Sequence, residues 1–152
     1  MTKAKASAIF SVLVAITLLT LEYGFAQSAI AIELITQAEA NYPPADEIRG
    51  PIPGPIVEVM SPPGDIPQRS PVRLFLRFTP FGGAKIDPES IRLIYEKRPE
   101  VELTPRVRPY ATVRGIDVPK ARVPPGTHVI RVLVRDTEGR LGSSTFKFVV
   151  TQ

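Results

Sequence analysis

The sequence contains no cysteine and only one histidine, His128, and these two shortages exclude several kinds of site. Without cysteine the chain can form no disulfide bond and can carry no acyl chain on an N-terminal cysteine. A typical zinc site needs three or four nitrogen or sulfur ligands, which one histidine cannot supply. We therefore expect a fold that is held by its hydrophobic core and that uses no metal and no cofactor.

Catalytic groups are also scarce. A nucleophilic serine needs a neighbouring base that is held in place by an acid, and the strand–turn–helix pattern Gly-x-Ser-x-Gly does not occur. Carboxylates occur in local pairs, such as Asp87 with Glu89 and Glu100 with Glu102, but a glycosidase needs two acids that face one cleft. Surface acids are the simpler interpretation, and we expect that the chain is not an enzyme.

The N-terminus has the pattern of a secretion signal. Two lysines precede an apolar run, Ala6 to Leu21, and small residues at Gly24 and Ala26 predict cleavage after Ala26. A second candidate site ends at Ala31. The apolar run is shorter than the roughly 20 residues that span a bilayer, so residues 1–26 are predicted to be a signal peptide. The chain is then exported to the periplasm, the cell surface or the medium; if the signal is uncleaved, it becomes a membrane anchor.

Proline is concentrated in the next part of the chain. Nine of the 17 prolines lie between Pro43 and Pro71, and the run from Pro51 to Pro55 predicts an extended spacer. We assign residues 27–54, with a net charge of −3, to this spacer, which could be partly helical or disordered. Residues 55–152 form the predicted folded domain.

That domain is basic. From Pro55 onward there are 16 basic and 10 acidic residues, and arginine supplies most of the positive charge. A positive domain favours anionic partners such as polysaccharides or lipid headgroups. Ordinary solvated surface charge is the alternative interpretation.

Apolar and polar residues alternate along several short segments of the domain, which is typical of half-buried strands. The predicted strands are 56–60, 72–78, 91–95, 130–135 and 146–150. Weaker strands are 101–103 and 110–113, and 116–118 is another short extended piece. Asp136 to Gly139 is predicted to be a hairpin turn. Asp87 to Ser90 is predicted to be another turn, which could also start one helical turn. The inward positions predict a core that includes Leu74, Leu76, Leu93, Ile130, Val132, Val134, Phe146 and Phe148.

The C-terminal hairpin resembles a known class of domain. Val123 to Val132, Asp136 to Arg140 and Phe146 to Val150 follow the order proline-glycine, strand, Asp-x-x-Gly turn, strand. This order resembles the last two strands of bacterial immunoglobulin-like and fibronectin-III-like domains. The resemblance covers about 30 residues closely and implies an all-β fold, an immunoglobulin-like antiparallel β-sandwich of about seven strands. The chain lacks the tryptophan and the cysteine pair of antibody domains.

His128 lies two residues before Ile130, at the position where such domains commonly carry a tyrosine that bonds back to upstream backbone. The resemblance therefore implies a structural corner role for His128, with a ring nitrogen in place of the tyrosine hydroxyl. A catalytic or metal-binding role is the alternative.

Strand parity also yields a candidate binding face. If Ile130 and Leu93 point inward, alternate residues on the last two strands and on the third strand share one outer face. An apolar strip surrounded by cations suggests a contact surface, and arginine suits carboxylate or phosphate groups. The spacer or another protomer covering the strip is the competing interpretation. The predicted ligand-binding residues are Arg92, Ile94, Arg131, Leu133, Arg135, Lys147 and Val149.

From these observations we expect an exported, non-catalytic module that binds an anionic envelope polymer or an envelope protein. The resemblance is also compatible with a purely structural spacer, an assembly subunit, or an accessory domain of a separately encoded hydrolase. Nucleic acid is disfavoured as a partner because an exported protein rarely meets it, and a membrane partner requires an uncleaved signal.

Overall fold

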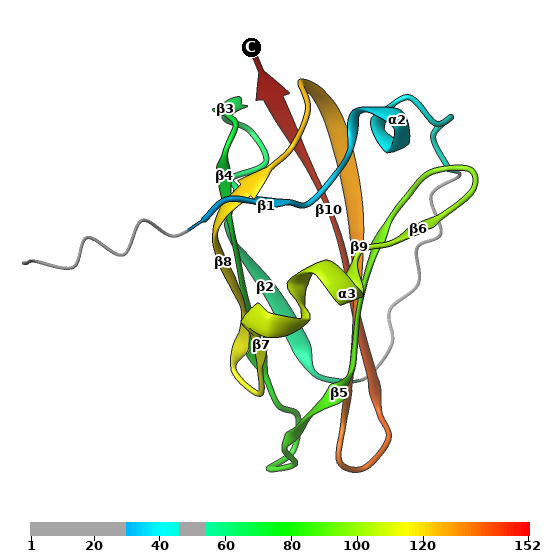
Figure 1. Ribbon diagram of the computed structural model, residues 1–152. Coiled ribbons are helices and arrows are strands. Elements are labelled where there is room, and N and C mark those ends of the chain that lie inside the picture. The colour runs from blue at the N-terminus through cyan, green and yellow to red at the C-terminus, as the bar shows by residue number, and fades with distance from the viewer. Residues whose placement is uncertain (1–29, 46–53) are drawn as a thin grey trace, which may run out of the picture.

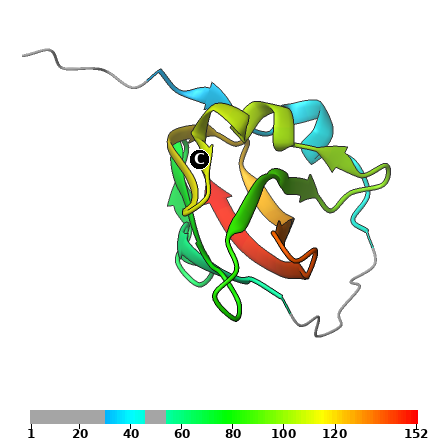
Figure 2. The same ribbon diagram turned by 90° about the horizontal axis from the view of Figure 1, so that it is seen from below.

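The protein is an all-β sandwich of two packed sheets, as Figure 1 and Figure 2 show. The structure is a computed structural model that describes residues 30–45 and 54–152. The predicted all-β sandwich is confirmed. The predicted signal peptide, residues 1–26, lies outside the described residues.

The first sheet has the strand order β1-β8-β4-β2, and β7 pairs with β8 in addition. Its long strands pair antiparallel, with Leu74 opposite Val118. The strands are β1 (Ile32–Glu33), β2 (Ile56–Ser61), β4 (Val72–Thr79), β7 (Ala111–Thr112) and β8 (Gly115–Arg122).

The second sheet has the strand order β3-β10-β9-β5-β6. The predicted C-terminal hairpin is present as β9 and β10, which pair antiparallel with Ile130 opposite Phe146, and β5 pairs with β9 as expected of the third strand. The strands are β3 (Gln68–Arg69), β5 (Ile86–Tyr95), β6 (Val101–Glu102), β9 (Gly126–Asp136) and β10 (Leu141–Thr151).

Two short pairings depart from the antiparallel pattern. β1 lies parallel to β8, and β3 lies parallel to β10. β3 follows β2 after a proline-rich turn at Pro62 and Pro63, so the chain leaves the first sheet and joins the second. The main strands are antiparallel as predicted, and the two added pairs make both sheets mixed.

The core lies between the sheets and contains the residues that parity placed inward. Seven of the eight predicted core side chains are buried, and Phe146 is half-buried and stacks on Phe148 with 6.1 Å between the ring centroids. The inward positions that alternation predicted are therefore correct, because alternate residues of a strand lie on the same side of its sheet.

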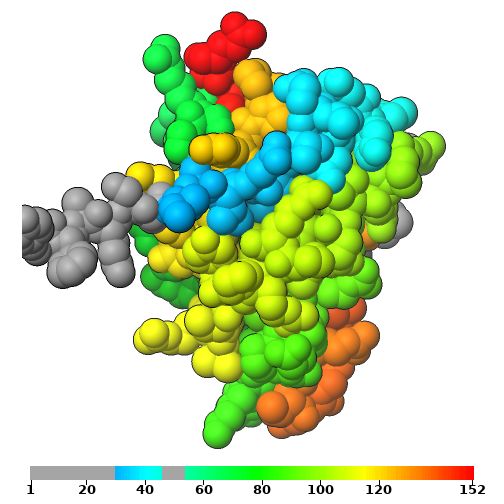
Figure 3. All heavy atoms as spheres, viewed as in Figure 1, coloured from blue at the N-terminus to red at the C-terminus, as the bar shows by residue number. Residues whose placement is uncertain are grey.

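The predicted spacer is partly built into the fold. Leu34 and Ile35 are among the most buried residues, and both backbone amides donate to the carbonyl oxygen of Arg122. Figure 3 shows the segment 30–45 lying across the surface next to the helical connection that precedes β7. The packed part of the chain therefore begins well before Pro55, because two buried apolar residues after a two-residue strand are too short a pattern to be read from the sequence.

A salt bridge fastens this segment to the domain. The segment contains the short helix α2 (Gln37–Ala40), which Thr36 and Glu39 cap reciprocally. Arg106 binds both carboxylate oxygens of Glu39, at 2.8 and 2.6 Å, and also donates to the carbonyl oxygen of Leu34. This hydrogen bonding lowers the pKa of Glu39 to about 2, despite the opposing effect of burial.

Sequence alternation missed two details of the connections. A helical stretch, α3 (Thr104–Val107) followed by the 3-10 turn η1 (Arg108–Tyr110), replaces the start of the predicted strand 110–113. The predicted turn at Asp87 to Ser90 lies inside β5, as an irregularity in its pairing with β9. In the described part of the chain, no helix is long and apolar enough to span a bilayer.

Candidate functional site

The predicted binding residues do share the outer face of the second sheet. The register places Arg92 opposite Leu133 and Ile94 opposite Arg131, and Arg131 is in turn opposite Thr145 of β10. Lys147 and Val149 extend the same face along β10. The strand parity that predicted this face is therefore correct.

Its principal arginines, however, are already paired with acids. Arg131 Nη2 lies 2.7 Å from Glu100 Oε1, and Arg131 Nε lies 2.8 Å from Glu96 Oε1 without the alignment of a hydrogen bond. Arg92 pairs with Glu102. These carboxylates lie in β6 and in the turn before it. The alternation of the strands that carry the arginines therefore could not predict these pairs.

The apolar strip on this face is also smaller than parity predicts. Ile94 is only 4% exposed, and Leu133 and Val149 are half-buried. Arg135 is exposed but donates to the carbonyl oxygen of Gly139 at 3.2 Å. In the described residues Lys147 has no ion-pair partner, so it is the cation of this face that is least engaged within the chain.

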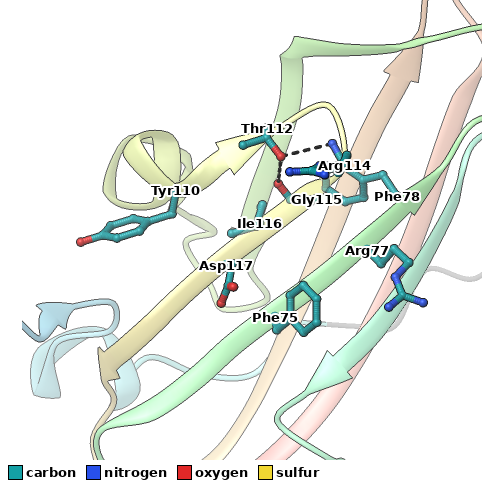
Figure 4. A pocket seen from close by; sticks show the side chains of 9 residues that line it. All are labelled: Phe75, Arg77, Phe78, Tyr110, Thr112, Arg114, Gly115, Ile116 and Asp117. Atoms are coloured by element: carbon teal, nitrogen blue, oxygen red, sulfur yellow. Dashed lines mark hydrogen bonds between the residues drawn. The ribbon is translucent and has the colours of Figure 1, made fainter. Parts of the chain in front are cut away.

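A second face offers a better-formed site. On the outer side of the first sheet, between β4 and the β7–β8 turn, lies an open hollow of about 540 Å³. Figure 4 shows its lining from close by. The lining residues are Phe75, Arg77, Phe78, Tyr110, Thr112, Arg114, Gly115, Ile116 and Asp117.

One side of the hollow is the outward row of β4. Alternation along this strand places Arg73, Phe75 and Arg77 on the outer face, with Phe75 opposite Asp117 of β8. The Arg73 guanidinium lies 4.8 Å from the centre of the Phe75 ring and binds both oxygens of Asp117, at 2.9 and 2.8 Å. This contact lowers the pKa of Asp117, so its carboxylate stays ionised.

The β7–β8 turn forms the other side. Thr112 Oγ1 accepts from the amide of Arg114 and donates to the carbonyl oxygen of Gly115, and the amide of Phe78 donates to the carbonyl oxygen of Arg114. Gly115 has a φ of +147°, and a Cβ there would lie 1.9 Å from the carbonyl oxygen of Leu76. A glycine is therefore required for the turn to approach β4 this closely.

Two arginines of the hollow are not neutralised by near acids. Arg77 Nη1 lies 3.9 Å from Glu58 Oε2, and both side chains are about half exposed, so this pair is weak. Within residues 30–45 and 54–152, no carboxylate lies within ion-pair distance of Arg114. The hollow thus combines two available guanidinium groups with the half-buried rings of Phe75 and Tyr110.

The single histidine lies elsewhere, inside the sandwich. His128 is buried; its Nε2 lies 2.9 Å from the carbonyl oxygen of Pro124, and its Nδ1 lies 2.9 Å from the hydroxyl of Tyr95. Because a carbonyl can only accept, Nε2 carries the proton and Nδ1 accepts from Tyr95. Burial lowers the pKa of His128 and raises that of Tyr95 to about 12, which keeps both groups neutral. The predicted corner role requires a hydrogen bond from His128 to upstream backbone, and the bond to Pro124 is of this kind. That the role of His128 is purely structural stays a prediction.

The sequence contained part of the signal for the hollow. Alternation in Val72 to Phe78 places Phe75 and Arg77 outward, and these residues could have been singled out from the sequence. Tyr110 and Arg114 could not, because they reach the hollow through α3, η1 and a two-residue strand. In the described part of the chain, no group of three or more acidic, histidine or cysteine residues is arranged to hold a metal ion.

Comparison with protein-family models, with curated proteins and with solved structures found no match to this chain.

Proposed function

We propose that this chain is an exported, non-catalytic, immunoglobulin-like module that binds an anionic partner of the cell envelope, either a polymer or a protein. The hollow on the first sheet is the binding site in this proposal. The partner's acidic groups contact Arg77 and Arg114, and its apolar surface contacts Phe75 and Tyr110.

The immunoglobulin-like assignment is supported by the strand order. In such domains strands A, B and E form one sheet and strands G, F and C the other. Here β2, β4 and β8 have the chain positions and the neighbours of A, B and E, and β10, β9 and β5 those of G, F and C. The bond from His128 to Pro124 occupies the place of the usual tyrosine corner.

The observation that carries the binding proposal is the difference in charge pairing between the two faces. In the hollow, Arg77 and Arg114 keep most of their hydrogen-bonding capacity, whereas Arg131 and Arg92 of the second sheet are committed to carboxylates. Ligand sites are typically concave and largely apolar, with a few convergent polar groups, and the hollow has this composition.

The non-catalytic assignment rests on His128. Both of its ring nitrogens are engaged, one by Tyr95 and one by Pro124, and the ring is buried. It is therefore not available as a general base for a nucleophile or a water molecule.

Export is proposed from the sequence of residues 1–26. N-terminal sequencing of the protein recovered outside the cytoplasm should begin at Gln27. If the protein is instead found in the membrane fraction with its first residues intact, the module is anchored and is not released.

Binding is tested on a panel of immobilised polyanions at low and high salt. The purified protein should be retained at low salt and released as ionic strength rises, because exposed charges are screened. The variant Arg77→Glu, Arg114→Glu should lose retention. The matched variant Arg135→Glu, Lys147→Glu makes the same change in net charge on the other face and should keep most of it.

An assembly subunit is the second candidate function. On edge strand β2 the outward side chains of Ile56 and Met60 are 57% and 45% exposed, which suits contact with another protein. Sedimentation of the purified protein discriminates between the two candidates: a defined oligomer without affinity for any polyanion favours the assembly role.

A further inference from the structure

We infer that the hollow on the first sheet binds a carboxylate-bearing sugar of an acidic polysaccharide, with the sugar ring on Phe75 and the carboxylate between Arg77 and Arg114. This inference rests on the proposed function and specifies its ligand. It is carried by three features of the hollow: its aromatic floor, its mixture of charges and its concave shape.

The aromatic floor favours a ligand that has an apolar face. Phe75 is half-buried in the middle of the outward row of β4, and Tyr110 lines the same hollow from η1. A sugar ring presents C–H groups on its faces and hydroxyl groups at its edge, so it can cover an aromatic ring while its polar groups stay hydrated. A simple inorganic anion would leave this apolar surface unused.

The mixture of charges favours a carboxylate over a densely charged polymer. Each guanidinium offers a planar fork that matches a carboxylate. The ionised Asp117 lies in the same hollow, but Arg73 neutralises it. The charge left for a ligand is therefore that of Arg77 and Arg114, which suits a partner with one or two acidic groups per bound unit. The Asp117 carboxylate can accept hydrogen bonds from sugar hydroxyls.

The concave shape disfavours a membrane surface. The β7–β8 turn approaches β4 closely at Gly115. Phe75 lines the resulting hollow, where it is half-buried and has the Arg73 guanidinium 4.8 Å from its ring centre. Aromatic residues that anchor proteins to lipid must reach beyond the surrounding surface. A polymer chain can enter an open hollow that a flat lipid surface cannot.

The experiment compares binding of the purified exported protein to polygalacturonate, to fully methyl-esterified polygalacturonate, to dextran sulfate and to phosphatidylglycerol vesicles. Polygalacturonate should bind at least tenfold more tightly than its neutral ester and more tightly than dextran sulfate. The variant Arg77→Gln, Arg114→Gln should weaken polygalacturonate binding at least tenfold, about 1.4 kcal/mol or more. Arg135→Gln, Lys147→Gln has the same net charge and should change it less than twofold.

The aromatic contact is tested separately, because Phe75 carries no charge. Phe75→Ala should weaken polygalacturonate binding several-fold without changing the salt dependence, and Phe75→Leu, which keeps apolar bulk without a ring, should weaken it nearly as much. A circular-dichroism melt confirms that each variant is folded.

The outcomes separate this inference from the proposed function. If the wild-type protein binds dextran sulfate as well as polygalacturonate and Phe75→Ala has no effect, the ligand class is overturned, whereas anion binding at the hollow survives. If the protein binds the vesicles more tightly than polygalacturonate, the inferred sugar ligand is wrong and the ligand is an anionic membrane surface. If no anionic probe binds at all, the proposed function fails together with the inference.

Discussion

The outer faces of the two sheets both carry a group of arginines, but the arginines are placed in different surroundings. On the second sheet Arg131 contacts Glu96 and Glu100, and its side chain is only 18% exposed. On the first sheet Arg77 has one distant partner, and Arg114 has no carboxylate partner among the described residues. A count of positive charges would favour the second face, which carries Arg92, Arg131, Arg135 and Lys147, over the first, which carries Arg73, Arg77 and Arg114. The pairing of those charges nevertheless makes the first face the better site for an anionic ligand.

This difference shows what a basic face needs before it can bind. An arginine that already has two carboxylates must give them up to hold a new anion, and the exchange yields little free energy. An arginine that is only hydrated loses water instead. Substitutions on the two outer faces should therefore differ in their effects on stability and on binding, and both should differ from substitutions in the core between the sheets.

The largest effect should come from the shared core. Truncation of the buried Phe148 to alanine should lower the free energy of unfolding by about 3–5 kcal/mol, through lost transfer energy and a cavity. The same substitution at Phe75, on the outer face of the first sheet, should cost about 1 kcal/mol or less. Urea denaturation of both variants measures the difference, and equal losses would mean that the strand register of one sheet is misassigned.

His128 joins the core to upstream backbone, and its loss should be the next largest effect. His128→Ala should destabilise the protein by about 2–3 kcal/mol, because Tyr95 and Pro124 each lose a hydrogen-bond partner. His128→Tyr should be better tolerated, and neither variant should change ligand affinity per folded molecule.

The same residue predicts a pH dependence. Because the pKa of His128 is lower in the folded state than its usual 6.5, the unfolded state binds the extra proton first. The contribution of neutral His128 to the free energy of unfolding is therefore complete above pH 6.5. It is lost as the pH falls from 6.5 through the pKa of His128 in the folded state. Thermal melts between pH 7.5 and 5 should show this decline in the wild type and not in His128→Tyr. A folded tyrosine variant that fails to bind the ligand would contradict the structural role.

Charge reversal distinguishes the two faces directly. Arg131→Glu would bring a third carboxylate next to Glu96 and Glu100 and should cost about 1.5–3 kcal/mol. Arg77→Glu, at an exposed and weakly paired position, should change stability by about 1 kcal/mol or less. Thermal unfolding compares them at low and high salt. If both variants melt together with the wild type, the pairing on the second sheet contributes nothing and the contrast is lost.

For that reason Arg131→Glu combined with Arg135→Glu is a poor test of binding, although strand parity suggests it. The double variant would weaken the fold as well as the charge of the face. The pair Arg135 and Lys147 is the better probe of the second sheet.

Acid should act in opposite directions on two carboxylates. The pKa of Glu39 is about 2 because Arg106 binds it, so its contribution is complete above pH 4.5 and is lost as the pH falls towards 2. Burial raises the pKa of Glu96, so its ionisation costs stability, and this cost disappears as the pH falls. Glu39→Gln should therefore be less stable than wild type at pH 6, by about 1.5–3 kcal/mol, and nearly equal to it at pH 2.

The wild type should gain stability on mild acidification as Glu96 becomes protonated. Glu96→Gln should gain less, and this difference should be smaller than the one expected for Glu39→Gln. Chemical denaturation across this pH range measures both variants. A Glu39→Gln curve parallel to that of the wild type would show that the segment 30–45 is not held by Arg106.

Much of the fold could be predicted from the sequence, because period-two alternation is a direct consequence of strand geometry. The alternation at Ile130, Val132 and Val134 predicted which side chains of β9 face inward, and the turn at Gly139, with a φ of +79°, predicted the hairpin. Leu34 and Ile35 could not be assigned, because their burial depends on a pairing with Arg122 that is distant in the sequence.

The candidate site was less accessible for the same reason. Parity placed Arg131 and Arg92 on one face correctly, but it is silent about the acids that β6 and its preceding turn bring to them. The hollow depends on a glycine-mediated approach between β4 and the β7–β8 turn, at Gly115. Contacts between segments far apart in the chain decide which charges are free, and a local pattern does not report them.

The most direct test of the central claim is the salt dependence of polyanion binding by two charge-matched variants. We expect Arg77→Gln, Arg114→Gln to lose at least tenfold in affinity for polygalacturonate at low salt and to show a shallower salt dependence than the wild type. Arg135→Gln, Lys147→Gln should bind within twofold of the wild type. The reverse result, with loss in the second variant and full affinity in the first, would place the binding site on the second sheet. It would contradict the claim that weakly engaged arginines make the first face the site.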